Sequence, residues 1–158
     1  MSSEQGPARR EFVDTNVLVY AHDRSAGRKR ETAGDLLERL WDSRRGCVSL
    51  QVLQEFYVTV TGRTRRLLPP VEAARRIAWY SAWTLHEPGR PDLLSAIGLH
   101  VSLTISFWDA MILQSARRLG CGILWTEDLT HGQSYAGVIV RDPFREPDGA
   151  ARPPNSSE

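Results

Sequence analysis

Apolar side chains recur along this chain with two different periods. Between residues 32 and 41 they follow the i, i+3, i+4, i+7 spacing of an amphipathic helix. Short apolar runs that open at Phe12 and at Cys47 are instead typical of buried strands. Because such strands and helices alternate, the pattern predicts an α/β fold with three layers. We expect a central parallel sheet of four to five short strands with helices on both faces.

Glycine and proline mark the boundaries of the other expected elements. Gly62 and Gly120 each follow a helical pattern, and Pro70 suits the first turn of a helix. The remaining predicted elements are helices over 52–61, 70–83, 92–100 and 106–119, and strands over 122–125 and 137–140. Residues 1–10 and 145–158 are polar and contain Pro or Gly, so we expect disordered tails around one domain, 11–144.

The composition is that of a globular protein. Apolar residues make up 41% of the 158 residues and charged residues 25%, which argues against wholesale disorder. No apolar run approaches the roughly 18 residues needed to cross a membrane, and the first residues lack the apolar core of a secretory signal. Cys47 and Cys121 cannot form a disulfide framework, so we expect buried reduced thiols and a cytoplasmic protein with no membrane partner.

Several common enzyme classes lack their motifs here. The chain contains no P-loop, no G-x-G-x-x-G, no G-x-S-x-G, no C-x-x-C and no H-E-x-x-H. The 20 basic residues are 19 arginines and Lys29, and this lysine lies in a basic run. A receiver-like phospho-acceptor would need a suitably placed lysine, and a dehalogenase-like phosphatase would need D-x-D-x-T. Both classes are therefore disfavoured.

Four carboxylates occupy unusual surroundings. Asp14 ends the first apolar run, and Asp128 closely follows the predicted strand at 122–125. Asp109 is the single polar residue in the seven-residue run FWDAMIL, and Glu55 lies about one turn into a predicted helix. Ordinary structural roles remain open for each acid: a helix cap for Asp14 and Asp128, a capping box with Ser106 for Asp109, and an exposed helical position for Glu55.

Taken together, the four acids indicate a metal site. Two of them end parallel strands at one edge of the sheet, and two begin helices that leave the same edge. Carboxylates gathered in this way repel one another unless a cation neutralises them. Oxygen ligands without thiolate or imidazole suit Mg²⁺ or Mn²⁺, and such sites carry out metal-assisted phosphodiester hydrolysis.

Four segments carry a resemblance to a known family. They resemble the PIN-domain ribonucleases, specifically the VapC-like toxins of type II toxin–antitoxin systems. The segments are FVDTNVLVYAHD (12–23), SLQVLQEFY (49–57), SFWDAMILQSARRLGC (106–121) and LWTEDLTHGQ (124–133). The resemblance implies a PIN-like fold, an endoribonuclease that uses Mg²⁺ (or Mn²⁺), an RNA substrate and a VapB-like antitoxin. The alternative is a PIN-like module that binds RNA or a partner and has lost activity. Apolar stripes that include Trp79 and Trp83, or Trp41, suit a homodimer interface, and burial in the core is the alternative for them.

The resemblance also implies a role for each acid. Asp14 and Asp109 would bind the principal metal, Asp128 would complete its shell or bridge to a second ion, and Glu55 would hold a second metal or orient the attacking water. Glu127 competes with Asp128 for its role. Three neighbouring polar residues are expected to orient the carboxylates: Thr15, Asn16 and Ser106.

An RNA substrate requires cations around the acidic site. The segment from residue 24 to residue 66 holds ten basic residues against five acids, and the expected RNA contacts are Arg63, Arg65 and Arg66. A solvated basic loop, or a contact for an acidic antitoxin tail, remains open. Setting the four candidate ligands aside leaves 15 acids against 20 bases. The net charge of +1 therefore does not exclude a nucleic-acid partner.

Overall fold

The computed structural model describes residues 9–145, and both expected tails lie almost wholly outside this range. Its six strands are β1 (Arg10–Val13), β2 (Gly46–Ser49), β3 (Thr84–His86), β4 (Cys121–Trp125), β5 (Ser134–Tyr135) and β6 (Val138–Arg141). Its helices are α1 (Thr15–Ala21), the 3₁₀ turn η1 (Arg24–Ala26), α2 (Arg28–Ser43), α3 (Leu50–Thr61), α4 (Pro70–Tyr80), α5 (Arg90–Leu103) and α6 (Phe107–Arg118).

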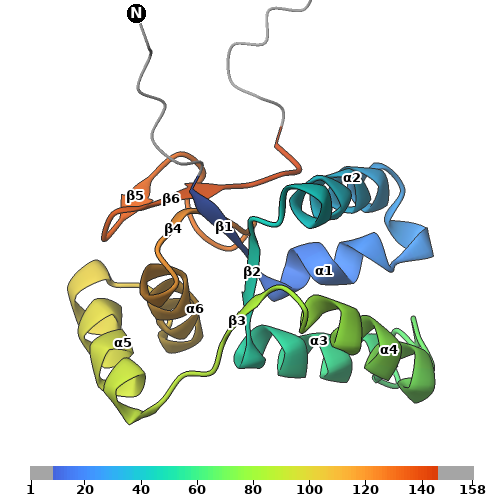
Figure 1. Ribbon diagram of the computed structural model, residues 1–158, viewed down its shortest axis with the longest axis horizontal. Helices are drawn as coiled ribbons and strands as arrows, with labels where there is room; N and C mark the ends of the chain where they lie inside the picture. Colours follow the sequence, from blue (N-terminus) through green and yellow to red (C-terminus); the bar gives the residue numbers. More distant parts are fainter. Residues whose placement is uncertain (1–8, 146–158) are drawn as a thin grey trace, which may run out of the picture.

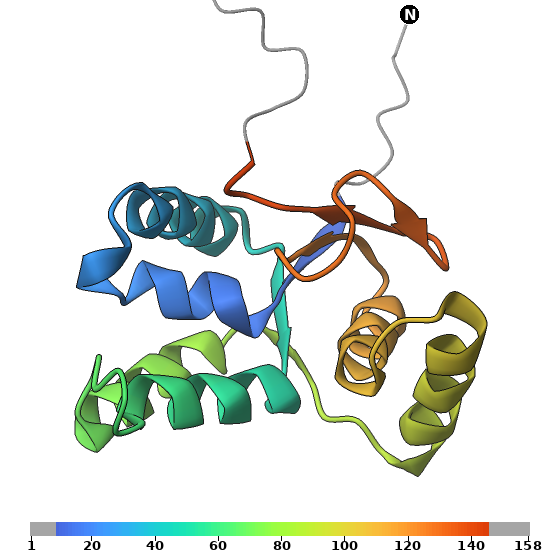
Figure 2. The ribbon, with the colours of Figure 1, turned by 180° about the vertical axis from the view of Figure 1, so that it is seen from behind.

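The strands form one sheet in the order β3-β2-β1-β4-β6-β5. Neighbouring strands pair in parallel, except that β5 runs antiparallel to β6. Helices α1 to α4 lie on one side of the sheet, and α5 and α6 lie on the other (Figures 1 and 2). The predicted three-layer α/β fold is confirmed. Because the chain continues from β1 to β2 on one side and places β4 on the other, the topological switch point lies between β1 and β4.

The number of strands differs from the expected four to five. Strand β3 has three residues and β5 has two, and runs this short leave no periodic signal in the sequence. A tight turn joins β5 to β6, with positive φ angles at Ala136 (49°) and Gly137 (89°). Two consecutive residues with φ above zero are typical of hairpin turns, which explains the antiparallel edge strand.

The apolar residues on the two sides of Asp14 belong to two different elements, a strand and a helix. Strand β1 ends at Val13, and α1 begins at Thr15 although valine and leucine dominate the helix. Asp14 separates the two elements because its carboxylate accepts a hydrogen bond from the Thr15 N–H at 2.7 Å, which caps the helix. The helix predicted over 70–83 ends earlier, at Tyr80.

The core surrounds β1, which has a neighbouring strand on each side. Phe12 and Val13 of β1 are fully buried, together with Phe56 of α3 and Leu124 of β4. Burying each such side chain contributes about 1.5–3 kcal/mol to folding. Cys47 and Cys121 are buried free thiols, as expected. No single helix within residues 9–145 is long and apolar enough to cross a membrane; the bent pair α5 and α6 reaches that length and composition only when both helices are combined.

Strand β1 carries a buried acid that the sequence did not single out. Glu11 is 3% exposed, and its two oxygens accept hydrogen bonds from Arg39 at 3.1 and 3.2 Å and from Trp125 Nε1 at 3.0 Å. Arg45 lies 3.7 Å away. Burial alone raises the pKa of Glu11, but the hydrogen bonds and the two guanidinium groups outweigh burial and lower it. Glu11 is therefore a fully compensated structural acid.

Candidate metal centre

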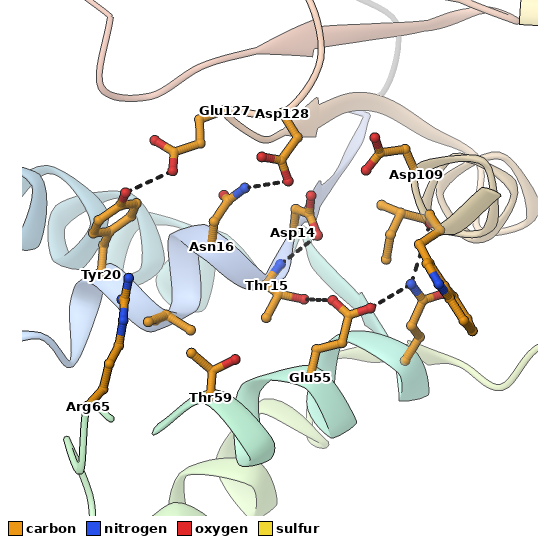
Figure 3. A pocket seen from close by; sticks show the side chains of 14 residues that line it. Asp14, Thr15, Asn16, Tyr20, Glu55, Thr59, Arg65, Asp109, Glu127 and Asp128 are labelled. Atoms are coloured by element: carbon orange, nitrogen blue, oxygen red, sulfur yellow. Dashed lines mark hydrogen bonds between the residues drawn. The ribbon is translucent and has the colours of Figure 1, made fainter. Parts of the chain in front are cut away.

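Three carboxylates meet at the switch point of the sheet. Asp14 follows β1, Asp109 lies in the first turn of α6, and Asp128 lies in the loop after β4. Each offers an oxygen that lies within 4.8 Å of the other two. Figure 3 shows the three side chains pointing toward one another from three separate elements. The structure therefore brings together three of the four acids selected from the sequence.

Burial disfavours the charged form of two of these carboxylates. Asp14 is 5% exposed, and its burial, together with the nearby Asp128 and Glu55, raises its pKa to about 7 despite hydrogen bonds from Thr126 and Thr15. The pKa of Asp128 is also raised, first by burial and then by Asp109. Among residues 9–145, no arginine or lysine forms an ion pair with either side chain or with Asp109. This absence contrasts with the two guanidinium groups at Glu11.

Glu55 lies beside the three aspartates rather than among them. Its Oε2 accepts a hydrogen bond from Thr15 Oγ1 at 2.7 Å, and its Oε1 accepts one from Gln51 Nε2 at 2.8 Å. The side chain is half-buried and lines the same pocket as the aspartates. Two donors therefore fix Glu55 at the edge of the acidic group, and it is not an ordinary exposed helical glutamate.

The capping roles considered for the aspartates coexist with their place in the group. Ser106 Oγ accepts a hydrogen bond from the Asp109 N–H at 3.1 Å and begins α6. This hydrogen bond uses the main chain of Asp109, so its carboxylate remains directed at the pocket (Figure 3). Asn16 Nδ2 donates to Asp128 Oδ2 at 3.1 Å. Of the three expected orienting residues, Thr15 and Asn16 contact carboxylates, whereas Ser106 acts on the backbone.

Sequence reasoning did not select two of the residues that hold the site together. Thr126 donates to Asp14 Oδ2 at 2.8 Å and accepts from the Asp128 N–H at 3.1 Å. Gln51 holds Glu55, and their i, i+4 spacing on one helix was a signal that could have identified it. Thr126 had only a weak signal, its position between a strand and a candidate acid.

Glu127 takes part in a different cluster from Asp128. Its Oε1 accepts a hydrogen bond from the Tyr20 hydroxyl at 2.8 Å, and its Oε2 forms an ion pair with Lys29 at 3.1 Å. The ammonium group of Lys29 lies 4.7 Å from the centre of the Tyr20 ring. Both oxygens of Glu127 are therefore engaged on the rim of the pocket (Figure 3).

The pocket that contains the acids has a volume of about 300 Å³, and its lining also includes aromatic, basic and hydroxyl side chains. Trp108 precedes Asp109 on α6 and is 63% exposed. Arg65 and Thr59 line it beyond Glu55 (Figure 3). Of the three arginines expected to contact RNA, only Arg65 lines this pocket; Arg66 lines a neighbouring one.

The donor atoms fit a hard divalent cation. Carboxylate oxygens are the ligands of the three converging side chains, and Mg²⁺ and Mn²⁺ prefer oxygen. The buried Asp14 carboxylate has no cationic partner among the residues that the structure describes, so its negative charge lacks the compensation that a buried ion requires. The residues present are therefore those that would hold such an ion.

Comparisons with known proteins agree with this architecture. The chain resembles three solved structures: Mycobacterium tuberculosis VapC20, a toxin that cleaves the sarcin–ricin loop (24% identity, 75% of this chain and 89% of that chain, TM-score 0.58); a toxin–antitoxin complex from Klebsiella pneumoniae (22%, 86% and 99%, 0.59); and DNA-bound VapBC from Salmonella typhimurium (16%, 86% and 99%, 0.60).

A search of curated proteins returns no significant match. The family model for the PIN domain, however, matches residues 12–133, a range that begins within β1 and ends after Asp128. It thus includes every element that contributes an acid to the site. With this match over most of its length, the chain belongs to the PIN domain family.

Proposed function

We propose that the protein is a metal-dependent endoribonuclease that hydrolyses RNA phosphodiester bonds. The observation that carries the proposal is the convergence of Asp14, Asp109 and Asp128 within 4.8 Å, with no basic side chain paired to them among residues 9–145. The PIN-domain match supports it, as does the likeness to a toxin described as cleaving the sarcin–ricin loop.

The three aspartates would hold Mg²⁺, or Mn²⁺ in its place. When bound, such an ion lowers the pKa of a water ligand and offsets the negative charge that develops on the phosphate during attack. Thr126 keeps the Asp14 carboxylate in place, and Asn16 does the same for Asp128. Hydrogen-bond donors of this kind fix the orientation of the carboxylates.

Glu55 would orient the attacking water and accept its proton. Both of its oxygens are hydrogen-bonded, to Thr15 and to Gln51, which restricts the carboxylate to one orientation at the edge of the aspartate group. A carboxylate at this position can also contribute to a second metal site. In either role Glu55 would act from the edge of the aspartate group, where Thr15 and Gln51 hold it.

The two ends of the pocket suit a single strand of RNA. Trp108 presents an exposed ring on which a base can stack, and Arg65 presents a guanidinium group to a backbone phosphate. Between them lie the acids. A strand that spans the pocket would thus place one phosphodiester over the aspartates.

The protein is further proposed to be the toxin of a VapBC-type pair, with a VapB-like antitoxin as its partner. Two of the similar structures are described as a toxin–antitoxin complex and as VapBC. A homodimer is proposed from the exposed apolar surface, which includes Trp79 at 55% and Trp41 at 47% exposure; Trp83 is instead partly buried against the core. The mass of the purified protein in solution tests the dimer.

Cleavage of RNA by purified protein tests the nuclease proposal. The wild-type chain is expected to cut single-stranded RNA in Mg²⁺ or Mn²⁺ and to lose this activity in EDTA. Asp14→Asn and Asp109→Asn should reduce cleavage by at least about 10³-fold, because each removes a metal ligand. Asp42→Asn, at an exposed position on α2, is the matched control.

Two outcomes would contradict the proposal. Unchanged cleavage by both aspartate variants would place the active site elsewhere. Binding of RNA by the wild-type chain without cleavage in either metal would instead favour an inactive PIN-like binding module.

A further inference from the structure

A second pocket, of about 600 Å³, adjoins the acidic pocket at the end of the helical layer formed by α1 to α4. Its cationic side chains come from η1, from α2, from the segment after α3 and from α4: Arg24, Arg30, Arg65, Arg66 and Arg76. We call it the arginine pocket. Arg65 lines both pockets, so the two share this side chain as a wall.

The charge of the arginine pocket is largely uncompensated. Asp23 is the one acid in its lining, and its Oδ1 already accepts hydrogen bonds from Ser25 N at 2.9 Å and Ser25 Oγ at 2.6 Å. Its Oδ2 lies 3.8 Å from Arg65. The other four arginines form no ion pair with any residue that the structure describes. Several guanidinium groups therefore face one occupied carboxylate.

A partly buried histidine lies beside these arginines. His22 lines the arginine pocket, and its burial, followed by the charges of Arg76 and Arg30, lowers its pKa to about 4. His22 is thus neutral at physiological pH and adds no charge. The groups that remain to attract a ligand are the guanidinium groups.

The backbone at Arg66 is strained for an arginine. Its φ of 45° lies in the left-handed region, and its N–H donates to the Gly62 carbonyl at 2.9 Å, just after the end of α3. Glycine is the usual residue at such a position because a Cβ atom is disfavoured there. Non-glycine residues held in this region gather at functional sites. Arg66 therefore places a guanidinium group at a position where the backbone conformation favours glycine.

We propose that the arginine pocket binds a backbone phosphate of RNA, next to the phosphodiester that lies over the three aspartates. This inference rests on the proposed nuclease function and adds the path of the strand: from the acidic pocket, past Thr59 and Arg65, into the arginine pocket. Guanidinium groups suit phosphate because they offer paired N–H donors.

The shared wall favours RNA over an acidic protein segment as the occupant. A strand that enters the arginine pocket through Arg65 must also pass the carboxylates of the acidic pocket. RNA also offers bases, which can stack on the exposed ring of Trp108 in the acidic pocket, whereas an acidic peptide offers only further anions to both pockets.

Two arginine-to-glycine variants in the same backbone conformation test the proposal. Arg44, at the C-terminal end of α2, also has a left-handed φ, 58°, and lies by a different pocket. Arg66→Gly and Arg44→Gly should both raise Tm, because glycine relieves the backbone at each position. Only Arg66→Gly should weaken binding, measured with a fluorescent 12-nucleotide single-stranded RNA in an Asp109→Asn background that does not cleave it.

The expected loss is about five- to tenfold in RNA affinity. The slope of log K against log[salt] should fall by about 0.7 for each phosphate that is no longer paired with a guanidinium group. A second pair, Arg30→Ser with Arg28→Ser as its control, should show the same contrast; both side chains are exposed on α2, and only Arg30 lines the pocket.

Equal affinities and slopes for Arg66→Gly, Arg30→Ser and their controls would overturn the proposal. The proposal would also be overturned if Arg66→Gly and Arg30→Ser lost affinity for a poly-glutamate peptide but not for RNA. That result would assign the pocket to an acidic protein segment. The nuclease proposal fails separately, through absence of cleavage by the wild-type chain in Mg²⁺ and Mn²⁺.

Discussion

Thr126 Oγ1 donates a hydrogen bond to Asp14 Oδ2 at 2.8 Å and accepts one from the Asp128 main chain at 3.1 Å. One buried hydroxyl thus joins the acid that follows β1 to the acid that follows β4. The first of these hydrogen bonds crosses the switch point of the sheet, where the first and fourth strands lie side by side, and the second lies within the loop after β4. Thr126 is therefore a positioning residue for both carboxylates.

Replacing this hydroxyl should weaken metal binding without removing a ligand. Thr126→Val keeps the shape of the side chain, and we expect Mn²⁺ affinity, measured by calorimetry, to fall by about 10–100-fold. Thr126→Ser retains the hydroxyl and should stay within about threefold of the wild type. Equal affinities for the valine and serine variants would show that the hydrogen bond to Asp14 has no part in metal binding.

Glu55 should contribute to the rate rather than to the principal metal site. Glu55→Gln keeps an acceptor for Thr15 but removes the carboxylate, so RNA cleavage is expected to fall by about 10²–10⁴-fold. Mn²⁺ affinity at the three aspartates should change by less than about tenfold. Glu38→Gln, at an exposed acid of α2, serves as the control. A loss of cleavage that excess metal fully restores would make Glu55 a metal ligand instead.

The buried carboxyl of Asp14 should make the metal-free protein less stable as pH rises. Its pKa of about 7 in the folded chain lies above the ordinary value of 3.8, so the folded state binds the proton more tightly than the unfolded state. The contribution of Asp14 to stability is then greatest below pH 4 and falls through pH 7, by up to about 4 kcal/mol for a shift of this size. His22, whose pKa is lowered to about 4, acts with the opposite sign over much of the same range, so the effect of Asp14 is measured against a variant that lacks it.

Urea denaturation in EDTA between pH 4 and pH 8 measures this effect. Relative to Asp14→Asn, which keeps the contributions of His22 and Asp128, the wild type should lose stability as pH rises. This relative loss should diminish when Mg²⁺ is added, since the cation replaces the proton. Asp23 and Asp92, whose pKa values are lowered, act with the opposite sign and destabilise the protein only as pH falls toward their own pKa values. Identical pH profiles for the wild type and Asp14→Asn would exclude Asp14 as the cause.

The packing of α3 against the sheet can be tested by comparing substitutions at a buried and at an exposed position of this helix. Phe56 is fully buried, and Phe56→Ala should lower the free energy of unfolding by about 3–5 kcal/mol, because burial is reduced and a cavity is left behind. Val58→Ala, at a position 68% exposed on the same helix, should change it by less than about 0.5 kcal/mol. Chemical denaturation of both proteins checks the difference, and similar values would contradict the burial of Phe56 in the core.

The placement of the acids followed from local rules that the structure obeys. Parallel strands end at one edge of a sheet, so residues just beyond β1 and β4 must lie close together. Asp109 was recognisable because a lone acid in an apolar run needs a partner or an ion. Long helices such as α2 were visible through their periodicity, although their ends shifted by a few residues.

Other features could not be read from the chain because they depend on contacts between distant segments. The cluster of Glu127 with Lys29 and Tyr20 joins residues about a hundred positions apart. The burial of Glu11 depends on Arg39, which lies 28 positions further along the chain. The two-residue strand β5 exists only because a turn returns it to β6. In each case tertiary pairing, rather than local propensity, decides the structure.

The hydrogen bond between Asp14 and Thr126 spans 112 positions of the chain. Contacts of such separation form late in folding, because the entropy of closing a long loop must be overcome before they add any stability. Asp14 and its helix can form early, but the acidic group is incomplete until β4 pairs with β1. A folding intermediate that lacks this one strand pairing would hold most of the helical layer and none of the metal centre.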